Sequence, residues 1–163
     1  MASDRSPRRT LQTDCAMSDP RPGPIDRPDD LDILRAARGW LERDGRVALA
    51  TVIDTWGSAP VPVGGQMAVA VDGQFQGSVS GGCIEGEVIT AAEEVLSSGA
   101  PRTLEFGVAD ETAWTVGLPC GGNVKLYVQR LERAADGRAF LDRAVAAQAG
   151  RTGLIVRTRL ADG

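Results

Sequence analysis

From residue 29 onward, apolar positions follow first a helical and then an extended pattern. Residues 29–43 place apolar side chains at helical spacing, and Gly45 supplies a stop signal. Residues 46–54 then form a nearly continuous apolar, β-branched run, which is typical of a central strand covered on both faces. The pattern therefore predicts a helix that leads directly into a buried strand.

A hairpin and a second helix are predicted in the middle of the chain. Residues 66–71 and 74–79 have the pattern of two strands joined at Asp72-Gly73, a dipeptide that suits a tight hairpin because glycine adopts positive φ without steric cost. Apolar side chains then recur at helical spacing over residues 84–96. The stretch between these elements is a strand-to-helix corner.

The last third of the chain predicts two strands, a helix and a final strand. These are residues 103–106, 124–128, 134–149 and 153–158, with a polar link at 110–114. The order of elements predicts one mixed β-sheet with helices packed against it. The expected fold class is α/β (α+β), a layered sandwich.

The first 28 residues differ in composition from the rest. Pro, Arg, Asp and Ser dominate this stretch, so residues 1–28 are expected to form a disordered tail. Residues 29–163 are long enough for one domain with a hydrophobic core.

Composition narrows the function classes. The net charge of −4 gives no electrostatic support for nucleic-acid binding, and no apolar run approaches the roughly 20 residues that span a bilayer. The N-terminus lacks the apolar region of a secretory signal, and three widely spaced cysteines do not form a disulfide framework, so a cytoplasmic location is expected. The absence of histidine excludes Ser-His-Asp and Cys-His catalysis.

The strand-to-helix corner contains the first candidate chemistry. Ser80, Gly81 and Gly82 precede Cys83, and Glu85 follows it. Unpaired N–H groups and the helix dipole favour an anion at a helix start and ease ionisation of a thiol there. The motif indicates a ligand-contacting thiol above an anion-binding turn. The alternative is a small apolar side chain that caps a core helix, and the charge of Glu85 opposes thiolate formation.

A second glycine-flanked cysteine strengthens this interpretation. Cys120, Gly121 and Gly122 stand just before the apolar strand at 124–128. Two such motifs, each at the end of a predicted element, indicate two halves of one site that includes Cys83.

The long loop after the first strand supplies another candidate. Residues 55–65 are built from Gly, Pro and Ser, and long loops at strand ends often have functional roles. Ser58 is placed to donate a hydrogen bond to a phosphate or a flat polar ring. The alternative is a turn hydroxyl that bonds to its own backbone.

Together these motifs resemble the XdhC/CoxI family, specifically its N-terminal domain, over about residues 30–160. The segments that carry the resemblance are, in order, Gly57-Ser58-Ala59-Pro60, Gly65-Gln66-Met67, residues 77–85 and Cys120-Gly121-Gly122. The resemblance implies an accessory factor, not an enzyme, that matures molybdenum hydroxylases such as xanthine dehydrogenase or aerobic carbon monoxide dehydrogenase.

The resemblance also implies a ligand and partners. The ligand is molybdenum cofactor (molybdopterin), bound transiently, and the same resemblance implies roles in its sulfuration and insertion. The implied partners are the large subunit of a molybdenum hydroxylase and a cysteine desulfurase. A separate Rossmann-like subunit is a further candidate because no such domain follows in this sequence. Exposed strand edges and Trp40 or Trp56 make a second copy of the chain another candidate. The cofactor-binding candidates are Ser58, Ser80, Gly81, Gly82, Cys83, Glu85, Cys120, Gly121 and Gly122, with Cys83 and Cys120 as the candidate metal ligands.

Two departures from the family pattern keep alternatives open. Longer members have a Rossmann-like second domain, whereas no dinucleotide fingerprint occurs in this sequence, and Val61 stands where the family commonly has an arginine. One alternative is a cofactor-free interaction module that pairs with a separate Rossmann-like subunit. Another is a thiol-disulfide redox protein using Cys83 and Cys120. A closed zinc site is disfavoured because the two cysteines leave too few soft ligands.

Overall fold

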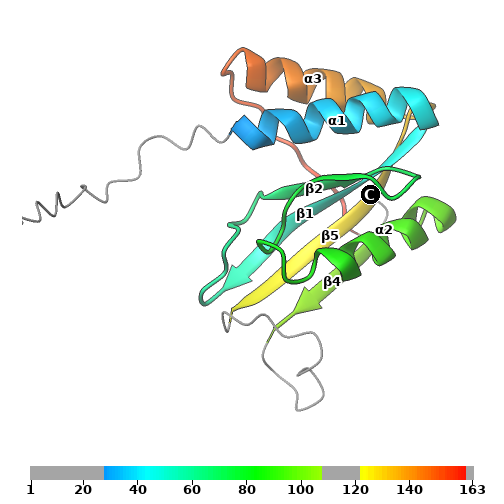
Figure 1. Ribbon diagram of the computed structural model, residues 1–163. Helices are drawn as coiled ribbons and strands as arrows, with labels where there is room; N and C mark the ends of the chain where they lie inside the picture. Colours follow the sequence, from blue (N-terminus) through cyan, green and yellow to red (C-terminus); the bar gives the residue numbers. More distant parts are fainter. Residues whose placement is uncertain (1–27, 108–121, 161–163) are drawn as a thin grey trace, which may run out of the picture.

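A computed structural model describes residues 28–107 and 122–160 (Figure 1). The 110–114 link, Cys120 and Gly121 lie outside these described ranges. So does the predicted tail, apart from its last residue, Pro28, which begins a helix. The elements are α1 (Pro28–Asp44), β1 (Arg46–Trp56), β2 (Gln66–Val69), β3 (Phe75–Gly77), α2 (Glu85–Ser98), β4 (Arg102–Phe106), β5 (Asn123–Glu132) and α3 (Gly137–Ala149).

The strands form one sheet in the order β3-β2-β1-β5-β4. Every neighbouring pair in this sheet is antiparallel. The expected combination of a sheet with packed helices is confirmed, but the sheet is antiparallel where a mixed one was predicted. The difference arises because β1, β2 and β3 follow one another through reversing connections, which produce antiparallel neighbours.

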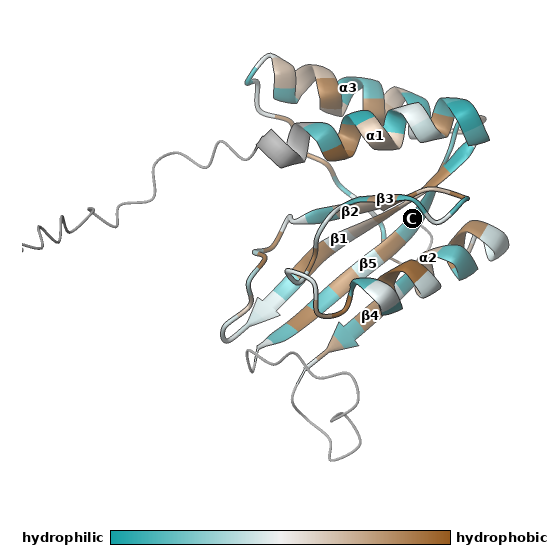
Figure 2. Cartoon of the chain, viewed as in Figure 1, coloured by the Kyte–Doolittle hydropathy of each residue, from teal (hydrophilic) through white to brown (hydrophobic). Residues whose placement is uncertain are grey.

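Helices cover both faces of the sheet. Helix α2 packs on one face, against β1 and β5, and helices α1 and α3 pack together on the other (Figure 1). Along β1, Ala48, Ala50 and Val52 belong to the core beneath α2, whereas Val47 and Leu49 belong to the core beneath α1 and α3. Figure 2 shows the apolar residues that run along β1 and β5. The prediction of a central strand buried on both faces is confirmed.

The predicted hairpin and second helix are also present. The β2–β3 turn is closed by the N–H of Ala70, which donates to the carbonyl of Gln74 at 2.8 Å, and Gly73 has a φ of +82°. Helix α2 ends at Gly99, which adopts the left-handed conformation with a φ of +79°. Glycine is favoured at both positions because other residues pay a steric cost at positive φ.

The predicted final strand at 153–158 is wrong. These residues are described but form no strand, and Ile155 is 96% exposed. Both hydrogen-bonding sides of β5 are already occupied, by β1 and β4, so β5 offers no free edge to this segment. The segment is instead tied to the sheet face by the Tyr127 hydroxyl, which donates to the carbonyl of Arg159 at 3.3 Å.

None of the helices in the described ranges combines the length and apolarity that a bilayer crossing demands.

Gly77 and Gly73 provide a matched pair for testing the hairpin. Both have positive φ, but a Cβ on Gly73 would meet open space, whereas one on Gly77 would collide with the Gln66 carbonyl and lie 2.7 Å from Cδ1 of Ile33. Gly73→Ala should lower the free energy of unfolding by about 1 kcal/mol, and Gly77→Ala by about 3 kcal/mol. Urea denaturation of both variants checks this difference, and equal losses would contradict the collision.

Candidate functional site

The Ser58 loop follows the end of β1, and Gly122, the described residue of the Cys120 motif, precedes the start of β5 at the same end of the sheet (Figure 1). Trp56, the last residue of β1, pairs with Asn123, the first residue of β5. A Cβ added to Gly122 would lie 2.9 Å from the carbonyl carbon of Ser58 and 3.0 Å from the nitrogen of Ala59. Glycine at this position therefore allows the main chain at residue 122 to lie against the main chain of the Ser58 loop.

The third motif reaches the same place through the loop that precedes α2. A Cβ added to Gly81 would lie 3.6 Å from Cβ of Pro60, so this loop contacts the segment that follows Ser58. The structure thus places Gly122 against Ser58 and Ala59, and Gly81 near Pro60 of the same loop. We call residues 78–84 the Cys83 loop.

Exposure divides the predicted site residues into two groups. Ser58, Gly81, Gly82 and Cys83 are exposed, and Cys83 is a free thiol. Ser80 and Glu85 are buried, with exposed fractions of 1% and 9%, and Gly122 is also buried.

Glu85 is held by five hydrogen bonds from its own loop. Its Oε1 accepts from the Ser78 hydroxyl at 2.6 Å, the Ser80 N–H at 3.1 Å and the Val79 N–H at 3.2 Å. Its Oε2 accepts from the Ser80 hydroxyl at 2.7 Å and the Ile84 N–H at 3.2 Å. The two oxygens of one carboxylate therefore organise the entire turn into α2.

The two serine hydroxyls extend this network. The Ser80 hydroxyl oxygen accepts from the N–H groups of Cys83 and Ile84, at 3.0 and 3.1 Å, while donating to Glu85. The Ser78 hydroxyl oxygen accepts from the N–H of Gly81 at 2.8 Å. These bonds use one donor and two acceptor positions of Ser80, which is the full capacity of a hydroxyl.

The network keeps Glu85 ionised. Burial alone would raise the pKa of this carboxyl group, but the hydrogen bonds from Ser78, Ser80 and the backbone of Ser80 and Gly82 outweigh burial and lower its pKa from 4.5 to about 2. The Glu85 carboxylate, which bonds to the Cys83 loop, is therefore negatively charged at neutral pH.

This arrangement differs from the turn that the sequence predicted. Ser80 and Glu85 were expected among the residues that contact a ligand, yet both side chains point into the loop and bond there. The backbone N–H groups of Val79, Ser80 and Ile84, which were predicted to suit an anionic ligand, donate to the carboxylate of Glu85. The sequence interpretation also missed Ser78. The available signal was a serine followed by a glutamate at a helix start, as in a capping box. More residues separate Ser78 from Glu85 than separate the two residues of a capping box.

Val61 lies in the core where the family pattern commonly has an arginine. Its side chain is 8% exposed and packs in the cluster beneath α2 with Val52 and Met67. In this chain the position after Pro60 therefore faces inward. The two tryptophans considered as interface residues differ, because Trp40 packs partly against the core of α1 and α3 whereas Trp56 is 74% exposed.

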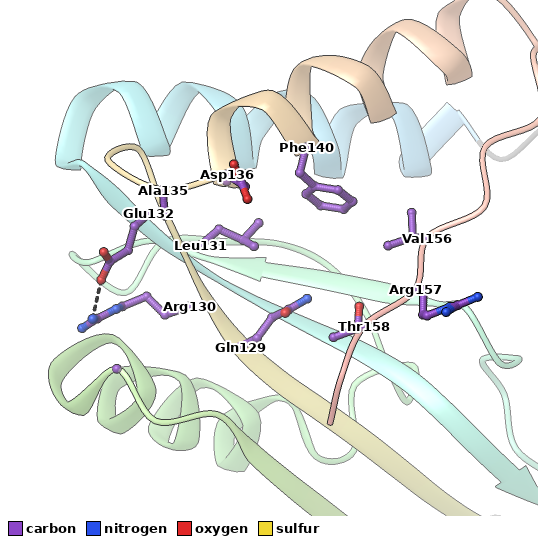
Figure 3. Close-up of a pocket in the computed structure, with 12 residues that line it drawn as sticks. Gln129, Arg130, Leu131, Glu132, Ala135, Asp136, Phe140, Val156, Arg157 and Thr158 are labelled. Carbon is purple, nitrogen blue, oxygen red and sulfur yellow. Dashed lines mark ion pairs between the residues drawn. The ribbon is translucent and has the colours of Figure 1, made fainter. Parts of the chain in front are cut away.

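A separate cavity of about 510 Å³ lies between the end of β5 and the start of α3 (Figure 3). Its lining includes Gln129 and Leu131 of β5, Phe140 of α3, and Val156 and Thr158 of the C-terminal segment. Beside these residues, Arg130 forms an ion pair with Glu132. None of the predicted site residues that the structure describes lines this cavity, since it is at the opposite end of β5 from Asn123.

Within the described ranges no group of three or more His, Cys, Asp or Glu side chains could hold a metal ion. Cys83 is the one candidate metal ligand that these ranges contain, and Cys120 lies outside them.

The fold and site define a small α/β domain whose glycine- and serine-rich loops converge at one end of an antiparallel sheet. Residues 40–107, which include the Ser58 loop, the hairpin and the Cys83 loop, match the model of the XdhC and CoxI family. The resemblance inferred from the motifs is confirmed, and this part of the chain belongs to that family.

Similar proteins support the same assignment. The molybdenum cofactor insertion chaperone PaoD of Escherichia coli (strain K12) is 36% identical over 116 residues, which are 71% of this chain and 36% of that protein. A protein of Bacillus subtilis (strain 168) described as a probable subunit of xanthine dehydrogenase is 30% identical over 94 residues, covering 56% of this chain and 28% of that protein.

The fold is found in a solved structure as well. The crystal structure of a xanthine dehydrogenase from Bacillus halodurans superimposes with a TM-score of 0.61 at 25% identity, covering 75% of this chain and 35% of that chain. The chain thus spans about a third of the length of these relatives, or less.

The ionised Glu85 should make the stability of the domain sensitive to acid. Because folding lowers its pKa from 4.5 to about 2, its stabilisation is complete above pH 4.5 and is lost as the pH falls towards 2. Across that interval, the free energy of unfolding should fall by about 3 kcal/mol more in the wild type than in Glu85→Gln. Urea denaturation at stepwise pH measures this, with the exposed Glu87→Gln as the control that should retain the wild-type slope. Equal slopes for wild type and Glu85→Gln would contradict the assignment.

Proposed function

We propose that this domain is an accessory maturation factor, not an enzyme, that binds molybdenum cofactor transiently and assists its insertion into a molybdenum hydroxylase. The observation that carries the proposal is the convergence of Ser58, Gly81 and Gly122 beside the exposed thiol loop, in a chain similar to an insertion chaperone. Support of cofactor sulfuration, with a cysteine desulfurase as a further partner, belongs to the same proposal.

The chemistry of the exposed residues fits this cofactor. Gly81 and Gly82 present bare main chain at φ values of +81° and +111°, which lets a flat polar ring approach the backbone. The Cys83 thiol is a soft ligand suited to a metal held by sulfur, and Cys120 is proposed as a second thiol. Ser58 adds an exposed hydroxyl on the facing loop. Free thiols of this kind persist in a reducing compartment, which supports the cytoplasm as the site of action.

The partner is proposed to be the large subunit of a molybdenum hydroxylase of the xanthine dehydrogenase or carbon monoxide dehydrogenase type. Similarity to a probable xanthine dehydrogenase subunit supports this class of partner. The exposed indole of Trp56, at the end of β1 beside the site, is the type of side chain that anchors protein interfaces. A second copy of the chain remains a proposed partner for the same surface.

Anaerobic titration of the purified chain with molybdenum cofactor, followed by absorbance and gel filtration, tests the proposal. Wild type should retain the cofactor, and Cys83→Ala should bind it at least about tenfold more weakly, a loss of about 1.4 kcal/mol. Cys120→Ala should weaken binding in the same direction. Cys15→Ala removes a thiol outside the proposed site and is the matched control. Retention that is unchanged in both single variants and in the double variant would refute the role of the thiols.

A second candidate is a cofactor-free module that pairs with a separate Rossmann-like subunit. The observation in its favour is the exposed apolar surface of the C-terminal segment, where Leu154, Ile155 and Val156 are all exposed. No cofactor binding by the wild-type chain alone, together with a stable complex with a Rossmann-like subunit that Ile155→Asp abolishes, would favour this candidate over the first.

A further inference from the structure

Five of the six backbone N–H groups from Val79 to Ile84 already donate hydrogen bonds within the Cys83 loop. The N–H groups of Val79, Ser80 and Ile84 donate to Glu85, and the backbone of Gly82 also helps to lower the pKa of that carboxyl group. The N–H groups of Gly81 and Cys83 donate to the hydroxyls of Ser78 and Ser80. A phosphate could use these donors only by breaking bonds that the loop already makes.

Charge opposes a second anion at the same place. The Glu85 carboxylate is ionised and lies directly beneath the loop, and Glu87 adds an exposed carboxylate in the first turn of α2. Two like charges about 4 Å apart repel by about 1 kcal/mol even in water, and by more near a protein surface. Both the filled donors and the charge therefore act against an anionic ligand.

We propose that Glu85 is the specificity-determining and positioning residue of the Cys83 loop: it occupies the loop's own anion site, so that the loop receives an uncharged or thiophilic part of a ligand and not its phosphate. This deepens the proposed function, on which it rests for the identity of the ligand. The phosphate of a bound cofactor is then held outside the Cys83 loop.

The same bonds hold the backbone that carries the thiol. Ser80 anchors the N–H of Cys83 and Glu85 anchors Ser80, while the Cys83 side chain remains exposed. The loop thus presents a sulfur atom outward and keeps its hydrogen-bond donors inward. A ligand meets Cys83 and the bare main chain of Gly81 and Gly82.

Inorganic phosphate is the first probe, with amide chemical shifts of the full chain as the measurement. Phosphate at up to about 50 mM, compared with chloride at equal ionic strength, should leave the amides from Val79 to Glu87 unshifted in wild type. Glu85→Ala frees the donors, so its loop amides should shift saturably, as those of an open anion site do. Saturable shifts in wild type, or none in a folded Glu85→Ala, would overturn the proposal.

Alkylation of Cys83 provides a second test that does not depend on Glu85→Ala folding. The rate with neutral iodoacetamide is divided by the rate with anionic iodoacetate, following the Cys83 peptide by mass spectrometry. This ratio should fall by about fivefold in Glu85→Gln, because one nearby negative charge is removed. The matched variant Glu87→Gln removes a charge of the same sign outside the network and should change the ratio less. Equal changes in the two variants would contradict the special position of Glu85.

These outcomes separate the inference from the proposed function. If wild type binds no molybdenum cofactor but the phosphate and alkylation results are as expected, the proposed function fails and the role of Glu85 stands. If the cofactor binds and phosphate competes with it at the Cys83 loop, the proposed function stands and the inference fails.

Discussion

The hydrogen bonds to the Glu85 carboxylate are the interaction on which the site depends. Burying a charge costs several kcal/mol, whereas each hydrogen bond to a charged group contributes about 1.5–3 kcal/mol. Five such bonds converge on Glu85, so the balance favours the ionised form, as its pKa of about 2 indicates. The carboxylate replaces the regular hydrogen bonds that the chain loses between β3 and α2. As a consequence, the backbone that carries the exposed thiol is held in place.

The pairing of β1 with β5 supplies the other constraint. These strands are far apart in sequence, yet their register places Trp56 opposite Asn123 and so brings Gly122 beside the loop that follows β1. Gly122 can then lie against the Ser58 loop because it has no side chain. The site thus combines a local network, built within one turn, with a contact that exists only because the sheet is folded.

Local patterns predicted the elements that depend on local physics. The apolar run of β1, the Asp72-Gly73 turn and the end of α2 at Gly99 all follow from side-chain burial and from backbone conformations that glycine tolerates. The segment at 153–158 also has an apolar pattern, but a strand forms only beside an unpaired strand edge. The C-terminal segment bonds to Tyr127 of β5, which is paired with β1 and β4, and no local pattern reports this. The sequence also identified Glu85 as part of the motif. It did not indicate that the side chain turns inward, because that direction depends on hydrogen bonds that form only in the folded loop.

A filled anion site is consistent with a protein that must release what it binds. If the N–H groups of the Cys83 loop were open, a phosphate held by them would gain several charge-assisted hydrogen bonds, and each of these would have to be broken on transfer. With Glu85 in that place, a ligand at the loop gains only the contact with sulfur and the van der Waals contact with the glycines. Under the proposed function, retention of the cofactor then depends on a thiol that a partner protein can displace, and transfer does not require the loop to unfold.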